Sequence, residues 1–509
     1  MKTRLEEELR TAYQSHSSKP AVIIPETGIQ YTYGELMIFT EQLSDKLLSM
    51  ELPKRSAIAL VMMNGIESIT SLLAVILSGH IAVPLNPSSA NAELSSLVAS
   101  TCAAIVLYSG SDVPDDYFVV PLVLVKIQDG KLEIRIAPSF FQADTKFPTL
   151  HAPLDCALVL STSGTTSKPK LVPLSADCSL LLAAKYFISA YELGLMDKVL
   201  LVMPLFHVHG LVGNLLPTLL SGGVAVIPRK FSASHFMIWS NRYKITWVSA
   251  VPTIYEILRK SPDQYIPLKH VAELKKSIRF IRSCSAPLSS SLYTFLKNTF
   301  GVRVIQAYGM TEAAHLLTTE TIRSGCPGSV GKIPLDMRQF KVIGADNVGG
   351  LGEICVKGPG VIDRYLNVSK DSSNFTDDGY LRTGDLGHLD DNGYLFLKGR
   401  IKELINRGGE KISPWEVEAI IQELSFVHKV VCFASFDAIY GEQVSCAIVP
   451  NDHCVETSQE LENLLSEHCQ TRLAAFKCPT KIFIVNEIPT SSIGKVQRTF
   501  LSQFFNDLS

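Results

Sequence analysis

The chain has 509 residues, of which 46% are hydrophobic and 19% are charged, and its formal net charge at pH 7 is −2. This length exceeds what one compact core usually holds, and the composition is typical of a folded globular protein. The near-zero net charge excludes a globally basic surface for binding nucleic acid or an acidic membrane.

The eleven cysteines form no CxxC or CxxH pair, and the N-terminus is charged and amphipathic rather than a signal peptide. These features predict reduced thiols, no zinc module and a cytoplasmic location. The last residues, Asn506 to Ser509, differ from the Ser-Lys-Leu peroxisomal signal and favour the same compartment. The longest uncharged stretch, 199–228, is interrupted by Pro204, Gly210 and Pro217, so we expect no membrane span.

Short apolar runs separated by helical patterns fill the first 310 residues. Continuous β-branched runs bounded by turns predict strands buried on both faces, and therefore largely parallel α/β sheets. The runs cover residues 56–62, 80–86, 103–109, 156–163, 198–204, 222–228, 245–252, 278–285 and 302–309.

The pattern changes after about residue 335. The segments 350–358, 378–387 and 391–400 carry Gly and Asp at hairpin positions, which predicts a small β-rich subdomain. A further helix and strand alternation begins near Gly399. We therefore expect an α/β protein with a large N-terminal domain of α/β subdomains, residues 1–398, and a small α+β C-terminal domain, residues 399–509.

A Ser/Thr-rich segment directly follows the apolar run at 156–160. Its hydroxyl and backbone N–H groups can surround phosphate oxygens, and its lysine supplies positive charge. The GxxxxGK[ST] pattern of a Walker loop is absent, and an exposed flexible turn is the alternative interpretation. The candidate phosphate ligands are Thr162, Ser163, Gly164, Thr165, Thr166 and Lys170.

Four further motifs follow along the chain: Gln306 to Glu312, Tyr380 to Asp385, Gly399 to Glu403, and Pro489 to Lys495. Each one alone is explained by a strand end, a hairpin turn or an exposed lysine loop. All five motifs in this order and at these separations are not explained by turns.

Together the five motifs resemble the acyl-adenylate-forming (AMP-binding) superfamily, which includes acid–CoA ligases, firefly luciferase and peptide-synthetase adenylation domains. The resemblance covers nearly the whole chain. It implies a large N-terminal domain, a small mobile C-terminal domain and an active site between them. It also implies two steps, in which a carboxylate attacks the α-phosphate of ATP–Mg²⁺ to give acyl-AMP, and a thiol, usually that of coenzyme A, then displaces AMP.

The first step needs cations and N–H donors, because a carboxylate anion must approach a polyphosphate. By resemblance, Tyr308 stacks on adenine beside Ala307, and Thr311 contacts the α-phosphate. Glu312 holds Mg²⁺ as a hard oxygen ligand. Asp385 accepts the ribose hydroxyls.

The resemblance also assigns residues around the C-terminal domain. Arg400 lies beside the ribose site, and Lys402 marks the hinge between the two domains. Lys495 bridges the attacking carboxylate and the α-phosphate during adenylation. The loop that faces the CoA arm contains Gly408, Gly409 and Lys411.

The candidate acyl pocket contains His207, His209, Ser285 and His315. A hydrocarbon substrate favours apolar residues there, because burying imidazoles against hydrocarbon costs free energy. Histidines and a serine suit a second carboxylate that pairs with a protonated imidazole. This set resembles plant and fungal oxalate–CoA ligases, whereas malonate–CoA ligases usually carry arginine in the place of Ala307.

Several alternatives stay open at this point. The substrate is oxalate, another small carboxylic acid or a 4-coumarate-like acid. If no second carboxylate binds in the pocket, His315 is a structural residue. A separate carrier protein could replace CoA as the thiol. A luciferase-like oxidation fits the polar pocket poorly, and a non-catalytic nucleotide sensor is at odds with the complete set Lys170, Thr311, Glu312, Asp385 and Lys495.

Overall fold

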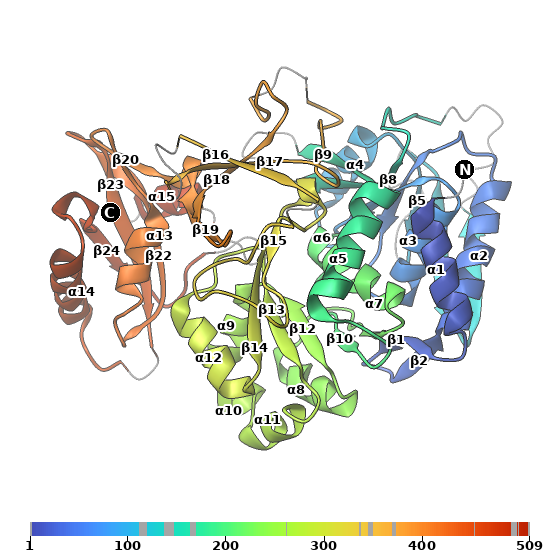
Figure 1. Cartoon of the computed structure of the whole chain (residues 1–509), viewed down its shortest axis with the longest axis horizontal. Coiled ribbons are helices and arrows are strands. Elements are labelled where there is room, and N and C mark those ends of the chain that lie inside the picture. Colours follow the sequence, from blue (N-terminus) through green and yellow to red (C-terminus); the bar gives the residue numbers. More distant parts are fainter. Residues whose placement is uncertain are drawn as a thin grey trace.

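The computed structural model describes residues 3–110, 120–136, 147–162, 169–260, 262–334, 337–344, 350–368, 373–451, 454–489, 496 and 498–506. Its helices and strands appear in Figure 1, coloured along the chain.

The first large sheet has seven strands in the order β7-β6-β5-β3-β4-β8-β9. The inner strands run parallel, whereas β7 and β9 are antiparallel edge strands. The edge position of β9 tolerates Pro173, because an edge strand leaves one row of N–H groups unpaired. The strands are β3 (Ala57–Val61), β4 (Ile81–Leu85), β5 (Ala103–Tyr108), β6 (Leu122–Gln128), β7 (Lys131–Ile136), β8 (Cys156–Thr162) and β9 (Lys170–Ser175).

The second large sheet has eight strands in the order β15-β14-β13-β12-β10-β11-β1-β2. The six inner strands are parallel, so their carboxyl ends meet at one edge, where ligands of open α/β sheets bind. The strands are β1 (Pro20–Ile24), β2 (Ile29–Thr32), β10 (Lys198–Leu200), β11 (Val224–Val226), β12 (Trp247–Ala250), β13 (Phe280–Ser283), β14 (Arg303–Tyr308) and β15 (Thr318–Thr319).

Helices cover both faces of these sheets. Helix α2 begins after Thr32, whose hydroxyl forms a reciprocal capping box with Glu35. Residues 208–220 form one helical segment in which α6 and α7 are joined by a π-helical turn at Leu211–Leu215. The helices of this region are α1 (Arg4–Ser15), α2 (Tyr33–Ser49), α3 (Ile66–Leu77), α4 (Asn91–Ser100), α5 (Leu182–Tyr191), α6 (Val208–Gly210), α7 (Leu216–Leu220), α8 (Ala233–Arg242), α9 (Pro252–Lys260), α10 (Pro262–Tyr265), α11 (Leu268–Leu274) and α12 (Ser290–Phe300).

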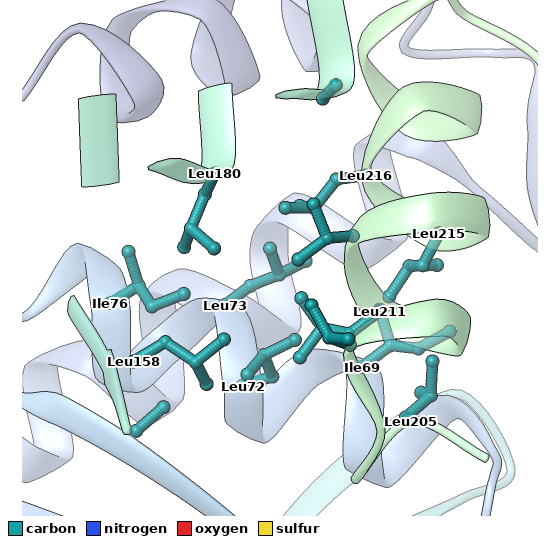
Figure 2. Packing of buried hydrophobic residues seen from close by; sticks show 14 of the residues in the cluster. Ile69, Leu72, Leu73, Ile76, Leu158, Leu180, Leu205, Leu211, Leu215 and Leu216 are labelled. Carbon is teal, nitrogen blue, oxygen red and sulfur yellow. The ribbon is translucent and has the colours of Figure 1, made fainter. Parts of the chain in front are cut away.

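One apolar core joins the two large sheets through α3, α5 and the helical segment 208–220. Figure 2 shows Leu72 and Leu73 of α3 packed beside Leu211 of the π-helical turn, with Leu158 of β8 on their other side. Burial of each such leucine contributes about 1.5–3 kcal/mol. The core therefore fixes the helical segment 208–220, which carries His209, against both sheets.

The remainder of the chain forms two smaller sheets. An antiparallel sheet contains β16 (Gln339–Ile343), β17 (Gly352–Lys357), β18 (Leu381–Leu389) and β19 (Leu395–Arg400). A five-stranded sheet contains β20 (Ile405–Arg407), β21 (Glu410–Ile412), β22 (Val427–Asp437), β23 (Gly441–Pro450) and β24 (Lys481–Ile484). It packs with α13 (Pro414–Ile421), α14 (Ser458–Arg472) and α15 (Arg498–Asn506) at one end of the molecule, beside β18 and β19 (Figure 1).

The predicted α/β fold, with a large N-terminal and a small C-terminal domain, is confirmed. Each of the nine apolar runs contains a strand of the two large sheets, and these nine strands lie in their parallel parts. The sequence did not predict the antiparallel edge strands β2, β7, β9 and β15, which are short, polar or proline-containing. In the part of the chain that the structure describes, no helix has the length and apolar character that crossing a bilayer requires.

The C-terminal domain contains a partly buried ion-pair cluster around Arg498. Its guanidinium donates to both carboxylate oxygens of Glu418, at 2.8 and 3.0 Å, and lies 3.4 Å from Glu403. Glu418 also accepts a hydrogen bond from the backbone N–H of Cys432 at 2.7 Å. The cluster thus ties α15 to α13, to β22 and to the turn that precedes β20.

We expect Arg498→Met to destabilise the C-terminal domain by roughly 2–4 kcal/mol, because Glu418 loses its cation while it stays partly buried. The measurement is amide hydrogen exchange of β22 and β23, which reports the opening free energy of this domain. The control Lys477→Met removes an exposed ion pair with Glu416 and costs at most about 1 kcal/mol. Equal effects of the two changes would contradict this account.

Candidate active site

The predicted adenine and ribose residues are in direct contact. Tyr308 ends β14, Asp385 lies in β18, and Arg400 ends β19. The Tyr308 hydroxyl donates to Oδ2 of Asp385 at 2.5 Å, and Nε of Arg400 donates to Oδ1 at 2.7 Å. Asp385 is buried, and its negative charge raises the pKa of Arg400. The structure therefore brings three of the sequence-predicted nucleotide residues together at one buried carboxylate.

A second group of contacts joins the predicted phosphate and magnesium residues. The Tyr365 hydroxyl donates to Oε1 of Glu312 at 2.9 Å, and Nζ of Lys170 lies 4.6 Å from the centre of the Tyr365 ring. Nζ of Lys170 also donates to Oδ1 of Asn374 at 2.6 Å. Burial raises the pKa of Glu312 and lowers that of Lys170, and the nearby charge of Lys402 lowers the Lys170 pKa further.

The strands β8 and β9 bring the ends of the predicted phosphate loop together, because Thr162 pairs directly with Lys170. The loop residues Ser163, Gly164, Thr165 and Thr166, and the candidate catalytic residue Lys495, lie outside the described residues. Thr311 begins the short helical turn after β14, and Ala307 is buried within β14. The predicted CoA loop is a hairpin between β20 and β21, where Gly408 and Gly409 take φ values of 58° and 101° and Lys411 is exposed.

The acyl-pocket candidates lie at the carboxyl edge of the eight-stranded sheet, against the helical segment 208–220. Ser249 of β12 and Arg282 of β13 are register partners, so their side chains project from the same face of the sheet. Nη1 of Arg282 donates to Oγ of Ser249 at 2.9 Å. The same nitrogen lies 3.3 Å from Nε2 of His209 and 3.2 Å from Nε2 of His315.

The two histidines also contact each other and the predicted serine. The rings of His209 and His315 are stacked with their centres 4.4 Å apart. Oγ of Ser285 lies 3.2 Å from Nδ1 of His209. The structure thus brings together three of the four predicted pocket residues, while His207 lies two residues before His209 with its ring 4.6 Å from that of Phe206.

Three residues around this cluster have a strained backbone conformation, which holds the cluster's side chains in place. Ser285, Ala314 and His315 take positive φ values of 72°, 51° and 65°, which cost free energy for residues with a Cβ. Gly213, in the π-helical turn, makes room for His315, since a Cβ there would lie 2.5 Å from Cδ2 of His315. Such strain and π-helical turns are concentrated at functional sites.

Arg282 is fully buried, and none of its hydrogen-bond partners among the described residues is acidic. Its guanidinium is held by a hydrogen bond from Nε to the Tyr191 hydroxyl at 2.7 Å and lies 5.0 Å from the centre of the Phe187 ring. These contacts offset part of the cost of burying a cation. A guanidinium charge therefore lies next to both histidines, a feature that the sequence did not predict.

The sequence did not predict roles for Arg282, Ser249 and Tyr365. Arg282 had a usable signal, because a charged residue inside an apolar strand run is almost never fully buried without a specific role. Ser249 and Tyr365 had none, since a serine in a strand and a tyrosine in a loop are common everywhere. Their roles depend on strand pairing and on contacts between distant segments.

Comparison with known proteins identifies the family. The sequence profile of the AMP-binding enzyme family matches residues 9–366, and that of the AMP-binding enzyme C-terminal domain matches residues 416–495. The chain therefore belongs to the AMP-binding enzyme family.

Relatives of known name and a solved structure agree with this membership. A probable CoA ligase, CCL9 of Humulus lupulus, is 34% identical and covers 98% of this chain and 95% of that protein. Oxalate–CoA ligase of Arabidopsis thaliana is 34% identical and covers 93% of each chain. ATP-bound MatB from Rhodopseudomonas palustris has a TM-score of 0.83 at 25% identity, covering 98% of this chain and 99% of that one.

The protein is an AMP-forming acid–CoA ligase, and its reaction uses ATP, Mg²⁺ and coenzyme A. Within the described ranges, no three or more histidine, cysteine, aspartate or glutamate side chains are grouped to hold a metal ion. Mg²⁺ needs no such group when substrate phosphates and one or two carboxylates bind it. The buried carboxylate of Glu312, close to Lys170, fits that mode of binding.

We expect Asp385→Ala to raise the apparent KM for ATP about 10- to 150-fold, the effect of losing a charge-assisted hydrogen bond. Loss of Asp385 also frees Tyr308 and Arg400 from the contacts that hold them. The measurement is the ATP dependence of pyrophosphate release at saturating acid. The exposed Asp378, which pairs with Lys341 at 3.0 Å, provides the control Asp378→Ala. An unchanged KM in Asp385→Ala would show that this turn is only structural.

Proposed function

We propose that the acid substrate is oxalate and the product oxalyl-CoA. The observation that carries this proposal is the buried guanidinium of Arg282, in contact with His209 and His315 at the carboxyl edge of the sheet. A buried cation without an acidic partner is expensive, and a bound anion offsets that cost. The 34% identity to the oxalate–CoA ligase of Arabidopsis thaliana gives independent support.

The size of oxalate also suits this arrangement. Its two carboxylates share one C–C bond, so the non-reacting carboxylate stays close to the reacting one. His315 lies three residues after Glu312 in the same loop, and its backbone N–H donates to the carbonyl of Met310 at 2.9 Å. We infer that this loop links the phosphate and acyl sites at the short spacing that a two-carbon diacid needs.

In this proposal the nucleotide residues act as the family resemblance implies. Asp385 binds the ribose hydroxyls, Tyr308 stacks on adenine, and Lys170 and Thr311 bind phosphate oxygens. Bound Mg²⁺, held by Glu312, would offset phosphate charge. The carboxylate oxygen attacks the α-phosphorus, the bond to the β-phosphate breaks, and pyrophosphate leaves.

Lys495 bridges the two reacting groups in that first step. In the second step the small domain turns at Lys402, and the CoA sulfur attacks the acyl carbon while AMP leaves. We propose that the hairpin with Gly408, Gly409 and Lys411 then faces the CoA arm.

A panel of acids tests the substrate proposal directly. AMP formation is measured with oxalate, malonate, acetate, octanoate and 4-coumarate, with CoA present or absent. We expect the highest kcat/KM with oxalate and dependence of turnover on CoA. A preference for octanoate or 4-coumarate would overturn the proposal. Activity that requires an added carrier protein would show that this protein, rather than CoA, is the thiol acceptor.

The variant His315→Ala tests the pocket. We expect it to lower kcat/KM for oxalate about 10- to 150-fold, because it removes a hydrogen-bonding group beside a buried carboxylate. The KM for ATP and the activity with acetate should change little. The same loss with oxalate and with acetate would make His315 a structural residue, and the substrate would then be an unspecified acid.

The variant Lys495→Ala separates the two half-reactions. We expect adenylation to fall about 10²- to 10⁴-fold, because a positioned cation in the transition state is lost. Thioester formation from supplied acyl-AMP should stay largely intact. The control Lys477→Ala, another lysine of the C-terminal domain, should leave both steps unchanged. Equal losses in both half-reactions would contradict a role confined to adenylation.

A further inference from the structure

We propose that Arg282, Ser249 and His209 form a hydrogen-bonded relay that holds the Ser285 hydroxyl as a donor toward the acyl substrate. The relay deepens the proposed acyl site, on which it rests, but it does not depend on which acid binds there. Arg282, Ser249 and His209 are positioning residues in this scheme, and Ser285 is the group that touches the substrate.

The first link follows from counting hydrogens on Arg282. Nη1 carries two N–H groups and can only donate, yet three possible acceptors lie within 3.3 Å of it. The two shorter contacts are Oγ of Ser249 at 2.9 Å and Nε2 of His315 at 3.2 Å. Nε2 of His209, at 3.3 Å, is therefore left for another donor.

Ser249 supplies that donor. Its Oγ accepts from Arg282 and lies 2.8 Å from Nε2 of His209, so its own hydrogen is available for this nitrogen. An N–H on Nε2 of His209 would instead leave two donor nitrogens, Nε2 and Nη1 of Arg282, 3.3 Å apart with no lone pair between them. The lone pair on Nε2 is thus the favourable state, and the proton of the neutral ring lies on Nδ1.

The last link reaches the accessible end of the relay. Nδ1–H of His209 donates to Oγ of Ser285 at 3.2 Å, which directs the Ser285 hydroxyl hydrogen away from the ring. Arg282, Ser249 and His209 are buried, whereas Ser285 is partly exposed. The positive φ of 72° at Ser285 is the backbone cost of this position.

The hydrogen bonds of the relay also determine the charge of the pocket. Both histidines accept hydrogen bonds at Nε2, one from Ser249 and one from Arg282, so both are neutral. The permanent charge of Arg282 then provides the attraction for an anion, and neutral donors provide the direction. A guanidinium keeps its charge across the physiological pH range, unlike an imidazole.

Nitrogen-15 NMR of the full-length enzyme labelled on histidine tests the proton arrangement. The His209 signals are assigned by their loss in His209→Gln. We expect a protonated Nδ1 and an unprotonated Nε2 in the unliganded enzyme, and a change of this pattern in Ser249→Ala. A doubly protonated ring, or a proton on Nε2, would overturn the relay.

Kinetics of Ser249→Ala, Ser285→Ala and the double variant test the connection between the two ends. We expect losses in kcat/KM for the acid of about 3- to 10-fold for Ser249→Ala and about 10- to 150-fold for Ser285→Ala. The kcat/KM of the double variant should lie within about twofold of that of Ser285→Ala, because both changes break the same hydrogen-bonded relay. The buried Ser240 of α8 provides the control Ser240→Ala, which should leave kcat/KM unchanged.

The two experiments separate this inference from the substrate proposal. Losses that multiply in the double variant would overturn the relay whichever acid is used. A preference for another acid in the panel, with the Nδ1 proton and the non-additive losses intact, would overturn oxalate and support the relay. Because each serine change removes a single oxygen atom, the variants are expected to fold.

Discussion

The guanidinium of Arg282 is fully buried in the eight-stranded sheet, and its surroundings are arranged to accommodate it. Tyr191 accepts from Nε, Phe187 lies against the cationic plane, and Ser249 accepts from Nη1. A buried charge needs hydrogen bonds from the protein, because it has lost its solvation by water. The strained backbone at His315 and the missing side chain at Gly213 are consistent with this need, since both let an imidazole approach the cation.

The nucleotide side of the site follows the same physical rule with the opposite sign. Asp385 is a buried anion, and a phenol and a guanidinium each donate to one of its oxygens. The loop after β14 connects the two sides, because it carries Tyr308 at one end and His315 at the other. At Gly309 the loop folds so closely that a Cβ would lie 2.1 Å from the carbonyl oxygen of His315. A few residues of one loop therefore connect the contact with the buried anion Asp385 to the contact with the buried cation Arg282.

Nine parallel strands were readable from the sequence because burial on both faces leaves few polar positions in them, whereas the parallel strands β1 and β6 were not predicted. The runs at 245–252 and 278–285 became β12 and β13, with the strand ends near the predicted boundaries. The edge strand β7 escaped prediction because it alternates exposed and half-buried residues and includes three charged side chains. The π-helical turn at Leu211–Leu215 had no sequence signal, because its residues also suit an ordinary helix.

The sequence by itself determined the class of enzyme, because five short local motifs resemble one family, whose profiles match the chain. It also identified His209, Ser285 and His315 as members of one pocket. Only the tertiary structure placed Arg282 beside His209 and His315, with Tyr191 and Ser249 as hydrogen-bond partners of its guanidinium, and placed Tyr365 against Glu312. The physical reason is that a side chain's partners are set by strand register and by packing between distant segments. Ser249 and Arg282 are 33 residues apart in the chain and become neighbours only when β12 pairs with β13.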